Sequence, residues 1–123
     1  MKFTFKRNKR FNQDLSRWNT SSVTTMFGMF WYTHFNQAMP DWDLSRVVDT
    51  SFMFSSNIRF NQDISKWNMA SVTRMVHMFG YAHDFNSNIS TWDVSKVTTL
   101  SHVFYLAGAF NSDLSTWDVS KVT

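Results

Sequence analysis

Histidines and acidic residues are the side chains of this sequence that could bind a metal or transfer a proton. There are four histidines and nine aspartates, with no cysteine. His77 and His102 stand one repeat apart, and His34 and His83 both come just before a Phe-Asn pair. A zinc site needs three or four ligands, and the nearest acidic residues occupy other positions of the repeat. We therefore expect no metal and no cofactor, with the histidines on solvent-facing segments.

Sequence signatures of catalysis are missing. The chain has no Gly-rich phosphate loop, no H-E-x-x-H and no Ser-His-Asp signature. Nothing in the pattern sets two carboxylates into a dry cleft where their pKa values would separate. The sequence therefore predicts that the protein is not an enzyme.

A row of polar residues that recurs with the repeat is the best candidate for a binding surface. Side chains that alternate with buried ones along a strand face outward, so the row would form one continuous polar surface. An ordinary solvated strand face has the same composition, and both interpretations stay open. The row consists of Arg17, Asn19, Asp41, Asp43, Lys66, Asn68, Thr91, Asp93, Thr116 and Asp118.

An internal repeat must position these side chains. The pair Phe-Asn recurs five times, at spacings of 24 or 25 residues, and we number each repeat from its Phe as position 1. Position 8 is always Trp, position 13 always Val and position 20 always Phe. A stack of similar turns explains this pattern, because each position then becomes a continuous buried ridge. We expect one repeat domain over 1–123, with a tail of a preceding turn at 1–10, complete turns at 11–34, 35–59, 60–84 and 85–109, and an incomplete turn at 110–123.

The apolar spacing within one repeat predicts its local structure. Positions 5, 8, 10 and 13 have the spacing of a leucine-rich repeat, with short parallel strands expected at 17–20, 41–44, 66–69, 91–94 and 116–119. Positions 13, 16, 20 and 23 step by three or four, which indicates one short helix. The predicted fold is an α/β solenoid, a leucine-rich-repeat-like right-handed coil with one short parallel strand and one short helix per turn. We also expect the Asn residues of position 2 to form a ladder inside the bend, bonding from turn to turn.

Charge is concentrated in the first ten residues, which hold five of the twelve Lys and Arg residues. The stretch KRNKR at 6–10 could be a nucleic-acid patch. It aligns with SSNIR at 55–59, which favours a solvated loop, so no nucleic-acid partner is expected. No apolar run reaches the ~20 residues of a membrane span. No apolar region follows the basic segment, so this chain shows no signal peptide.

The stretches FNSDLSTWDVSKVT and FNQDISKWNMASVTRMVHMF resemble the 25-residue repeat of BspA-like leucine-rich-repeat surface proteins, also called the mycoplasma-type lipoprotein repeat. The resemblance covers residues 1–123, although Ala38, Pro40 and Thr50 depart from the usual pattern. It implies a cell-surface or secreted protein with a role in adhesion.

Together, the resemblance and the polar row lead us to expect a non-catalytic repeat module of a surface or secreted protein. Its strand face would recognise an unknown extracellular protein or glycan. Neighbouring repeats of a longer array are expected, with this chain as a fragment of it. The alternative is a structural spacer, or a degenerate gene fragment, without a ligand of its own.

Overall fold

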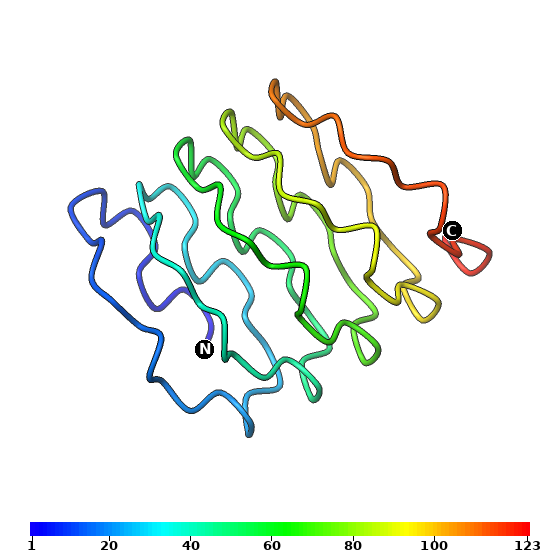
Figure 1. Ribbon diagram of the computed structural model, residues 1–123, viewed down its shortest axis with the longest axis horizontal. Coiled ribbons are helices and arrows are strands. Elements are labelled where there is room, and N and C mark those ends of the chain that lie inside the picture. The colour runs from blue at the N-terminus through cyan, green and yellow to red at the C-terminus, as the bar shows by residue number, and fades with distance from the viewer.

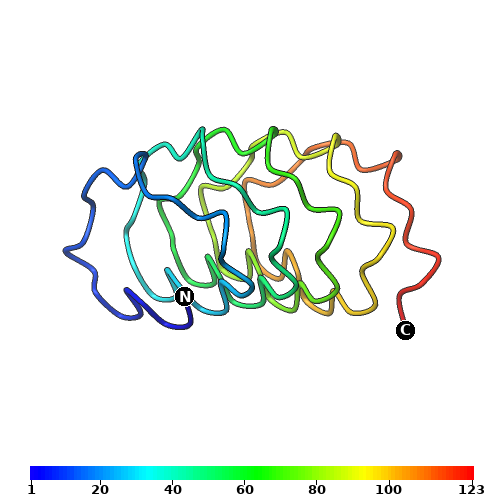
Figure 2. The ribbon, with the colours of Figure 1, turned by 90° about the horizontal axis from the view of Figure 1, so that it is seen from below.

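The chain winds into successive turns that stack side by side. The computed structural model describes all residues 1–123, and its two ends lie at opposite ends of the stack (Figures 1 and 2). It contains no helix and no extended strand. The only sheet-like pairing is a line of isolated parallel bridges at position 15, from Thr25 to Asp49, on to Arg74, and on to Thr99. The stack is therefore held together by turns and by contacts between turns.

The predicted α/β solenoid, with a leucine-rich-repeat strand and a helix in each right-handed turn, is wrong. The segments 17–20, 41–44, 66–69, 91–94 and 116–119 form no strands. The N–H of Trp18 donates to Leu15 O at 3.0 Å, and the N–H of Trp67 donates to Ile64 O at 3.1 Å. These backbone groups close bends within their own turn instead of pairing with the neighbouring turn. Alternating buried side chains arise at such bends as readily as in a strand.

The predicted helix is replaced by two consecutive tight turns at positions 16–19 and 20–23. The N–H of Met29 donates to Met26 O at 3.1 Å, and the N–H of Met53 donates to Thr50 O at 3.0 Å. A positive φ at the third of four residues is the mark of a type II turn. Positions 18 and 22 have a positive φ throughout, at Phe3, Arg7, Gly28, Tyr32, Phe52, Ser56, His77, Tyr81, His102 and Leu106. Because such turns recur every four residues, their apolar residues have helical spacing without a helix.

Hydrogen bonds between turns explain why this conformation is adopted. From the second complete turn to the third, the N–H groups of Thr50, Phe52, Phe54 and Ser56 donate to carbonyls of the next turn at 2.7–3.0 Å. In a helix, these N–H groups would bond to carbonyls four residues earlier in the same segment. A non-glycine residue at positive φ costs about 1–3 kcal/mol. The regular bonding to the neighbouring turn offsets that cost.

Stacked aromatic rings fill the interior. The position 20 rings follow one another at centroid distances of 5.5–5.9 Å, and the position 1 rings at 5.8–6.5 Å. Trp42 stacks on Trp67, and Trp92 on Trp117. Each indole N–H of these four residues donates to a position 5 carbonyl of the preceding turn, at 2.9–3.3 Å. Each fully buried ring contributes about 1.5–3 kcal/mol from its area alone.

The predicted asparagine ladder forms, but it does not lie inside the bend as expected. The backbone N–H groups of Asn36, Asn61, Asn86 and Asn111 each donate to the Oδ1 of the position 2 Asn one turn earlier, at 2.8–3.0 Å. Most of these side chains are exposed, so the ladder runs along the outside of the bend. Its regular spacing keeps neighbouring turns in register along this edge.

Candidate functional site

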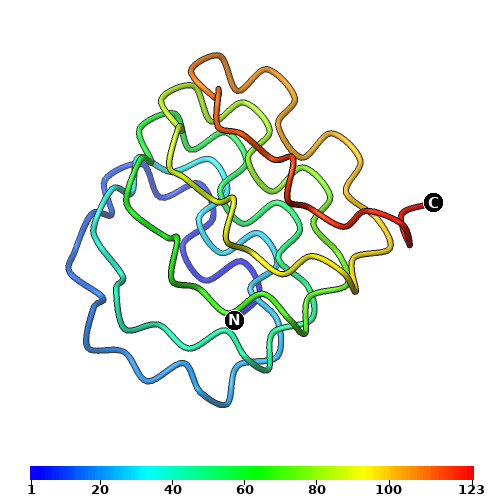
Figure 3. The same ribbon diagram turned by 45° about the vertical axis from the view of Figure 1, so that its right-hand side comes forward.

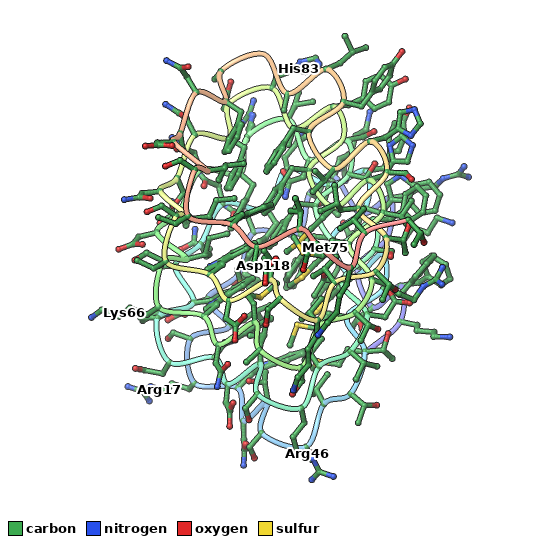
Figure 4. All side chains as sticks on the ribbon, turned by 90° about the vertical axis from the view of Figure 1, so that its right-hand side faces the viewer. Arg17, Arg46, Lys66, Met75, His83 and Asp118 are labelled. Atoms are coloured by element: carbon green, nitrogen blue, oxygen red, sulfur yellow. The ribbon has the colours of Figure 1, made fainter.

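The predicted polar row lies on the surface. All ten of its side chains are exposed. Arg17 and Lys66, which hold position 7 in two turns, project from the same side of the stack (Figure 4). The sequence therefore placed these residues correctly with respect to solvent, although no strand carries them.

The position 9 side chains of this row shape the backbone locally. Oδ1 of Asp43 accepts the N–H of Ser45 at 2.8 Å. The equivalent bond, from the N–H of position 11 to the side chain of position 9, forms in each of the remaining turns at 3.0–3.1 Å. The Ser45 hydroxyl and then its backbone N–H hold the pKa of Asp43 below its usual value. Asn and Asp side chains bonded to the backbone two residues on are a standard turn device. Half of the row is thus part of the scaffold.

Position 7 is only partly free. The hydroxyls of Thr91 and Thr116 donate to carbonyls of the preceding turn, at 2.8 and 2.6 Å. The side chains of Arg17, Asp41 and Lys66 make no hydrogen bond. Three side chains of the ten therefore remain uncommitted, and they are of mixed charge.

A second surface lies over the left-handed turns, and we call it the aromatic face. It consists of positions 17, 18, 21, 22, 24 and 25 of each turn. Figure 3 shows the turns running in parallel, so that each of these positions forms a line across the stack. Six of the nine exposed large hydrophobic residues of the protein lie here, namely Phe3, Tyr32, Ile58, Tyr81, Tyr105 and Leu106. A concentration of exposed aromatic residues on one face is typical of a binding surface.

Rings at position 18 stack along this face. Phe52 stacks on His77 at 5.2 Å, and His77 stacks on His102 at 4.7 Å. In the first complete turn the position is Gly28, with φ +59°, and a Cβ there would lie 2.7 Å from the ring of Phe3. Glycine at this point lets the Phe3 ring lie over the backbone and pack edge-on against Phe27 at 5.2 Å.

A groove of about 350 Å³ opens in the middle of the aromatic face. Its lining includes Tyr32 and Tyr81 at position 22 of two turns, and Ser55 and Ser56 at positions 21 and 22 of the turn between them. The groove exists because two serines stand where the preceding turn has an indole and a phenol. Trp31, Phe52 and His77 complete its wall. We call this the tyrosine groove.

The tyrosine groove continues over the neighbouring edge of the stack. A second hollow of about 190 Å³ shares Tyr32, Ser56 and Tyr81 with it. Lys9, Ile58 and the histidines of position 24 complete the lining, and one of these, His83, projects at that edge in Figure 4. No acidic residue lines either hollow.

Charge is distributed unequally around the stack. The aromatic face carries all four histidines and only Asp84 of the nine acidic residues. Six of the twelve Lys and Arg residues also lie here, namely Lys2, Lys6, Arg7, Lys9, Arg10 and Arg59. The ammonium of Lys6 lies 4.1 Å from the centroid of Trp31, and that of Lys9 lies 5.9 Å from the centroid of Tyr32. The basic N-terminal stretch is therefore packed against the aromatic residues at one end of the groove.

The histidines do not form a metal centre. No group of three or more His, Cys, Asp or Glu side chains is placed to hold an ion. Burial, followed by the neighbouring His102, lowers the pKa of His77 below its usual value. Its ring takes part in the stack between Phe52 and His102. The structure contains no helix that could span a membrane.

The repeat pattern does not predict the tyrosine groove. Tyr32, Ser56 and Tyr81 share position 22, which the apolar spacing places near the end of a helix, with no indication that these side chains line one surface. Its signal was the alternation of large and small residues at one repeat position. That alternation stood out less than the constant Trp, Val and Phe positions.

Comparison with family models agrees with the repeat. The family described as "Mycoplasma protein of unknown function, DUF285", a BspA-like repeat family, matches residues 1–57 and 31–123. Comparisons with curated proteins and with solved structures gave no match. Since the two matched segments together span the whole sequence, the chain belongs to the DUF285 family of repeat proteins.

Proposed function

We propose that the protein is a non-catalytic recognition module that binds an extracellular polysaccharide in the tyrosine groove. The observation that carries this proposal is the gap between Tyr32 and Tyr81. Both phenol side chains are substantially exposed, and the turn between them contributes only the small side chains of Ser55 and Ser56. Without a ligand, such a gap leaves aromatic surface open to water, which is unfavourable.

The chemistry of the groove suits a sugar ring. A pyranose has apolar C–H faces and polar hydroxyl edges, so it needs apolar walls with hydrogen-bonding groups at fixed places. Tyr32 and Tyr81 supply apolar walls, and each phenol adds one donor and acceptor at its tip. Ser56 adds a hydroxyl to the floor, and the ring of His77 supplies further nitrogen atoms.

The polar row is the second candidate surface. It is favoured by its exposure and its regular recurrence, but seven of its ten side chains bond to the backbone of their own or the preceding turn. The resemblance to BspA-like surface proteins supports adhesion and a location at the cell surface or outside the cell. A structural spacer without a ligand is the remaining alternative.

Two sets of variants separate these surfaces. Ser56→Tyr fills the tyrosine groove, and it is compatible with the backbone because both neighbouring complete turns already have Tyr at position 22. Asp43→Asn, Asp93→Asn and Asp118→Asn together remove three charges from the polar row. Asn already holds position 9 as Asn19 and Asn68, so the local turns are kept.

The experiment is a binding assay on a panel of immobilised neutral and acidic polysaccharides and extracellular-matrix proteins. We expect the wild type and the triple Asn variant to bind a polysaccharide equally, and Ser56→Tyr to lose that binding. Loss in the triple variant alone would move the site to the polar row. Binding of a matrix protein that is lost in Ser56→Tyr would identify a protein, instead of a polysaccharide, as the ligand of the groove. If the wild type binds nothing, the spacer is the better description.

A further inference from the structure

We infer that the tyrosine groove takes an acidic polysaccharide, one whose sugars carry carboxylate or sulfate groups. The inference rests on the proposed function and specifies its ligand class. It is drawn from the position of the positive charge relative to the groove and from the spacing of the groove walls.

The positive charge of the aromatic face lies at one end of the groove. Arg7 holds position 22 one turn before Tyr32, so the line that forms the groove runs Arg7, Tyr32, Ser56, Tyr81. The N–H of Arg7 donates to Trp31 O at 2.8 Å, which fixes this residue against the first wall of the groove. A guanidinium binds a carboxylate or a sulfate through two parallel hydrogen bonds.

Two lysines extend the same charge along the rim. Lys6 lies over the rings of Phe3 and Trp31, at 4.4 and 4.1 Å from their centroids, and Lys9 lies nearest Tyr32. Contact with a ring face holds each ammonium beside the groove. Little further side-chain freedom is therefore lost when a ligand binds there. A neutral sugar would leave these three charges unused, whereas a repeating anion can meet them in succession.

The spacing of the groove walls favours a sugar over a nucleic acid. Tyr32 and Tyr81 are two turns apart, as are the core rings of Phe30 and Phe79, which lie 5.5 and 5.7 Å from the ring of Phe54 between them. Taking the same two stacking distances for the groove puts its walls roughly 11 Å apart. A flat base contacts two walls at once only when they are about 7–8 Å apart. A puckered sugar ring with its substituents is thicker and fills the wider gap better.

The other ring faces are not available for base stacking. One face of Phe52 is covered by Trp31 at 5.0 Å, and the other by His77 at 5.2 Å. The next face of His77 is covered by His102. Single-stranded nucleic acids bind largely by stacking bases on open aromatic faces. The position 18 rings offer edges instead.

The test measures the affinity of the full chain for four polymers by calorimetric titration at low salt. Polygalacturonate carries carboxylates, heparin carries sulfates as well, dextran is neutral, and an oligothymidylate represents nucleic acid. We expect at least one of the two acidic polysaccharides to bind about tenfold more tightly than dextran and more tightly than the oligothymidylate, and its affinity to fall steeply with added salt. Which acidic polymer binds more tightly identifies the anionic group that is recognised.

Matched charge variants test the placement of the site. Arg7→Asn with Lys9→Gln removes two charges beside the groove, and Asn is tolerated at the positive φ of position 22. The control, Arg46→Gln with Lys96→Gln, removes two exposed charges at position 12. Arg46 projects from the edge opposite His83 (Figure 4). We expect the first pair to weaken acidic-polysaccharide binding by about tenfold and the control pair by less than about twofold.

Ser56→Tyr decides whether the groove itself is used. It adds an aromatic ring to the face, so non-specific adsorption to aromatic surface would rise, whereas binding within the groove falls at least about tenfold. Equal losses in the two charge pairs, or tighter binding of the oligothymidylate, would overturn the inference. Groove-dependent binding of dextran would overturn the inference and leave the proposed function standing. Binding of every polymer that is unaffected by Ser56→Tyr would overturn both.

Discussion

Replacement of Leu106 by glycine distinguishes the left-handed turns from a helix by the size of its effect. Leu106 holds position 22 with φ +54°, and its side chain is 58% exposed. At a positive φ, an L-residue is strained by roughly 1–2 kcal/mol relative to glycine. In the interior of a helix, the same replacement would instead cost about 1 kcal/mol.

The expected effect follows from three contributions. Relief of backbone strain contributes about 1–2 kcal/mol in favour of the variant. The greater freedom of glycine in the unfolded chain costs about 0.4–1 kcal/mol. Because Leu106 is 58% exposed, roughly two fifths of the burial of its side chain, about 0.6–1.3 kcal/mol, is lost as well. We therefore expect the free energy of unfolding of Leu106→Gly to stay within about 1 kcal/mol of the wild type, whereas the same replacement in a helix would lose about 2 kcal/mol.

The matched control is Ser101→Gly. Ser101 is also exposed, lies in the same turn and is not among the residues with positive φ. Here glycine relieves no strain, so the variant should be destabilised by about 0.4–1 kcal/mol. Urea unfolding followed by tryptophan fluorescence measures both values. If Leu106→Gly loses about 2 kcal/mol, clearly more than Ser101→Gly, position 22 is not left-handed and the turn geometry described above is wrong.

Three further effects are expected, each measurable by urea unfolding. Trp92→Phe loses the indole hydrogen bond at 3.0 Å and should cost about 1–2 kcal/mol, whereas Trp18→Phe, at an exposed ring without such a bond, should cost less than about 0.5 kcal/mol. Asn57→Ala should cost about 1–3 kcal/mol, because it takes the donor at 2.9 Å away from the carbonyl of Phe35, and removal of the buried Oδ1 that has no partner offsets only part of that cost. Acidification below pH 6.5 should destabilise the wild type more than His77→Asn. Burial, and then the neighbouring His102, lowers the pKa of His77 in the folded state. The phenol of Tyr105 is the other titratable group against that ring. The unfolded chain therefore binds more protons than the folded one in this acidic pH range. Equal pH dependence in the two proteins would contradict this.

The regular part of the sequence was sufficient to predict the stack but not its local structure. Constant Phe and Trp positions require that equivalent rings meet across turns, and Phe54 does lie 5.5–5.7 Å from its two equivalents. The same apolar spacing fits a helix and a pair of four-residue turns equally well. What decides between them is whether the N–H of Phe52 bonds within its own segment or to Val76 of the next turn. No single-turn pattern contains that information.

The role of the polar row was equally hard to predict. Alternation with buried positions predicted that its side chains are exposed, but not that its Asn and Asp oxygens accept hydrogen bonds from the backbone. Asp43 and Asp93 each bond to the backbone two residues on, and Asn19 does the same without a charge. Interchange of Asn and Asp at one position is what a turn-forming acceptor permits. A charge-dependent site would not tolerate it, so the sequence itself held the evidence for a scaffold role.

The tyrosine groove illustrates where a binding site can arise in a repetitive stack. When one position is large in every turn, adjacent side chains cover each other and leave a ridge, as the position 20 rings do. On the aromatic face, a hollow forms where a small residue stands between two large ones, as Ser56 does between Tyr32 and Tyr81. Since stability favours uniform positions, a departure from uniformity on the surface is the better guide to function. The most regular repeat positions of this sequence therefore describe its core, and a less regular one lines the groove where we propose the binding site.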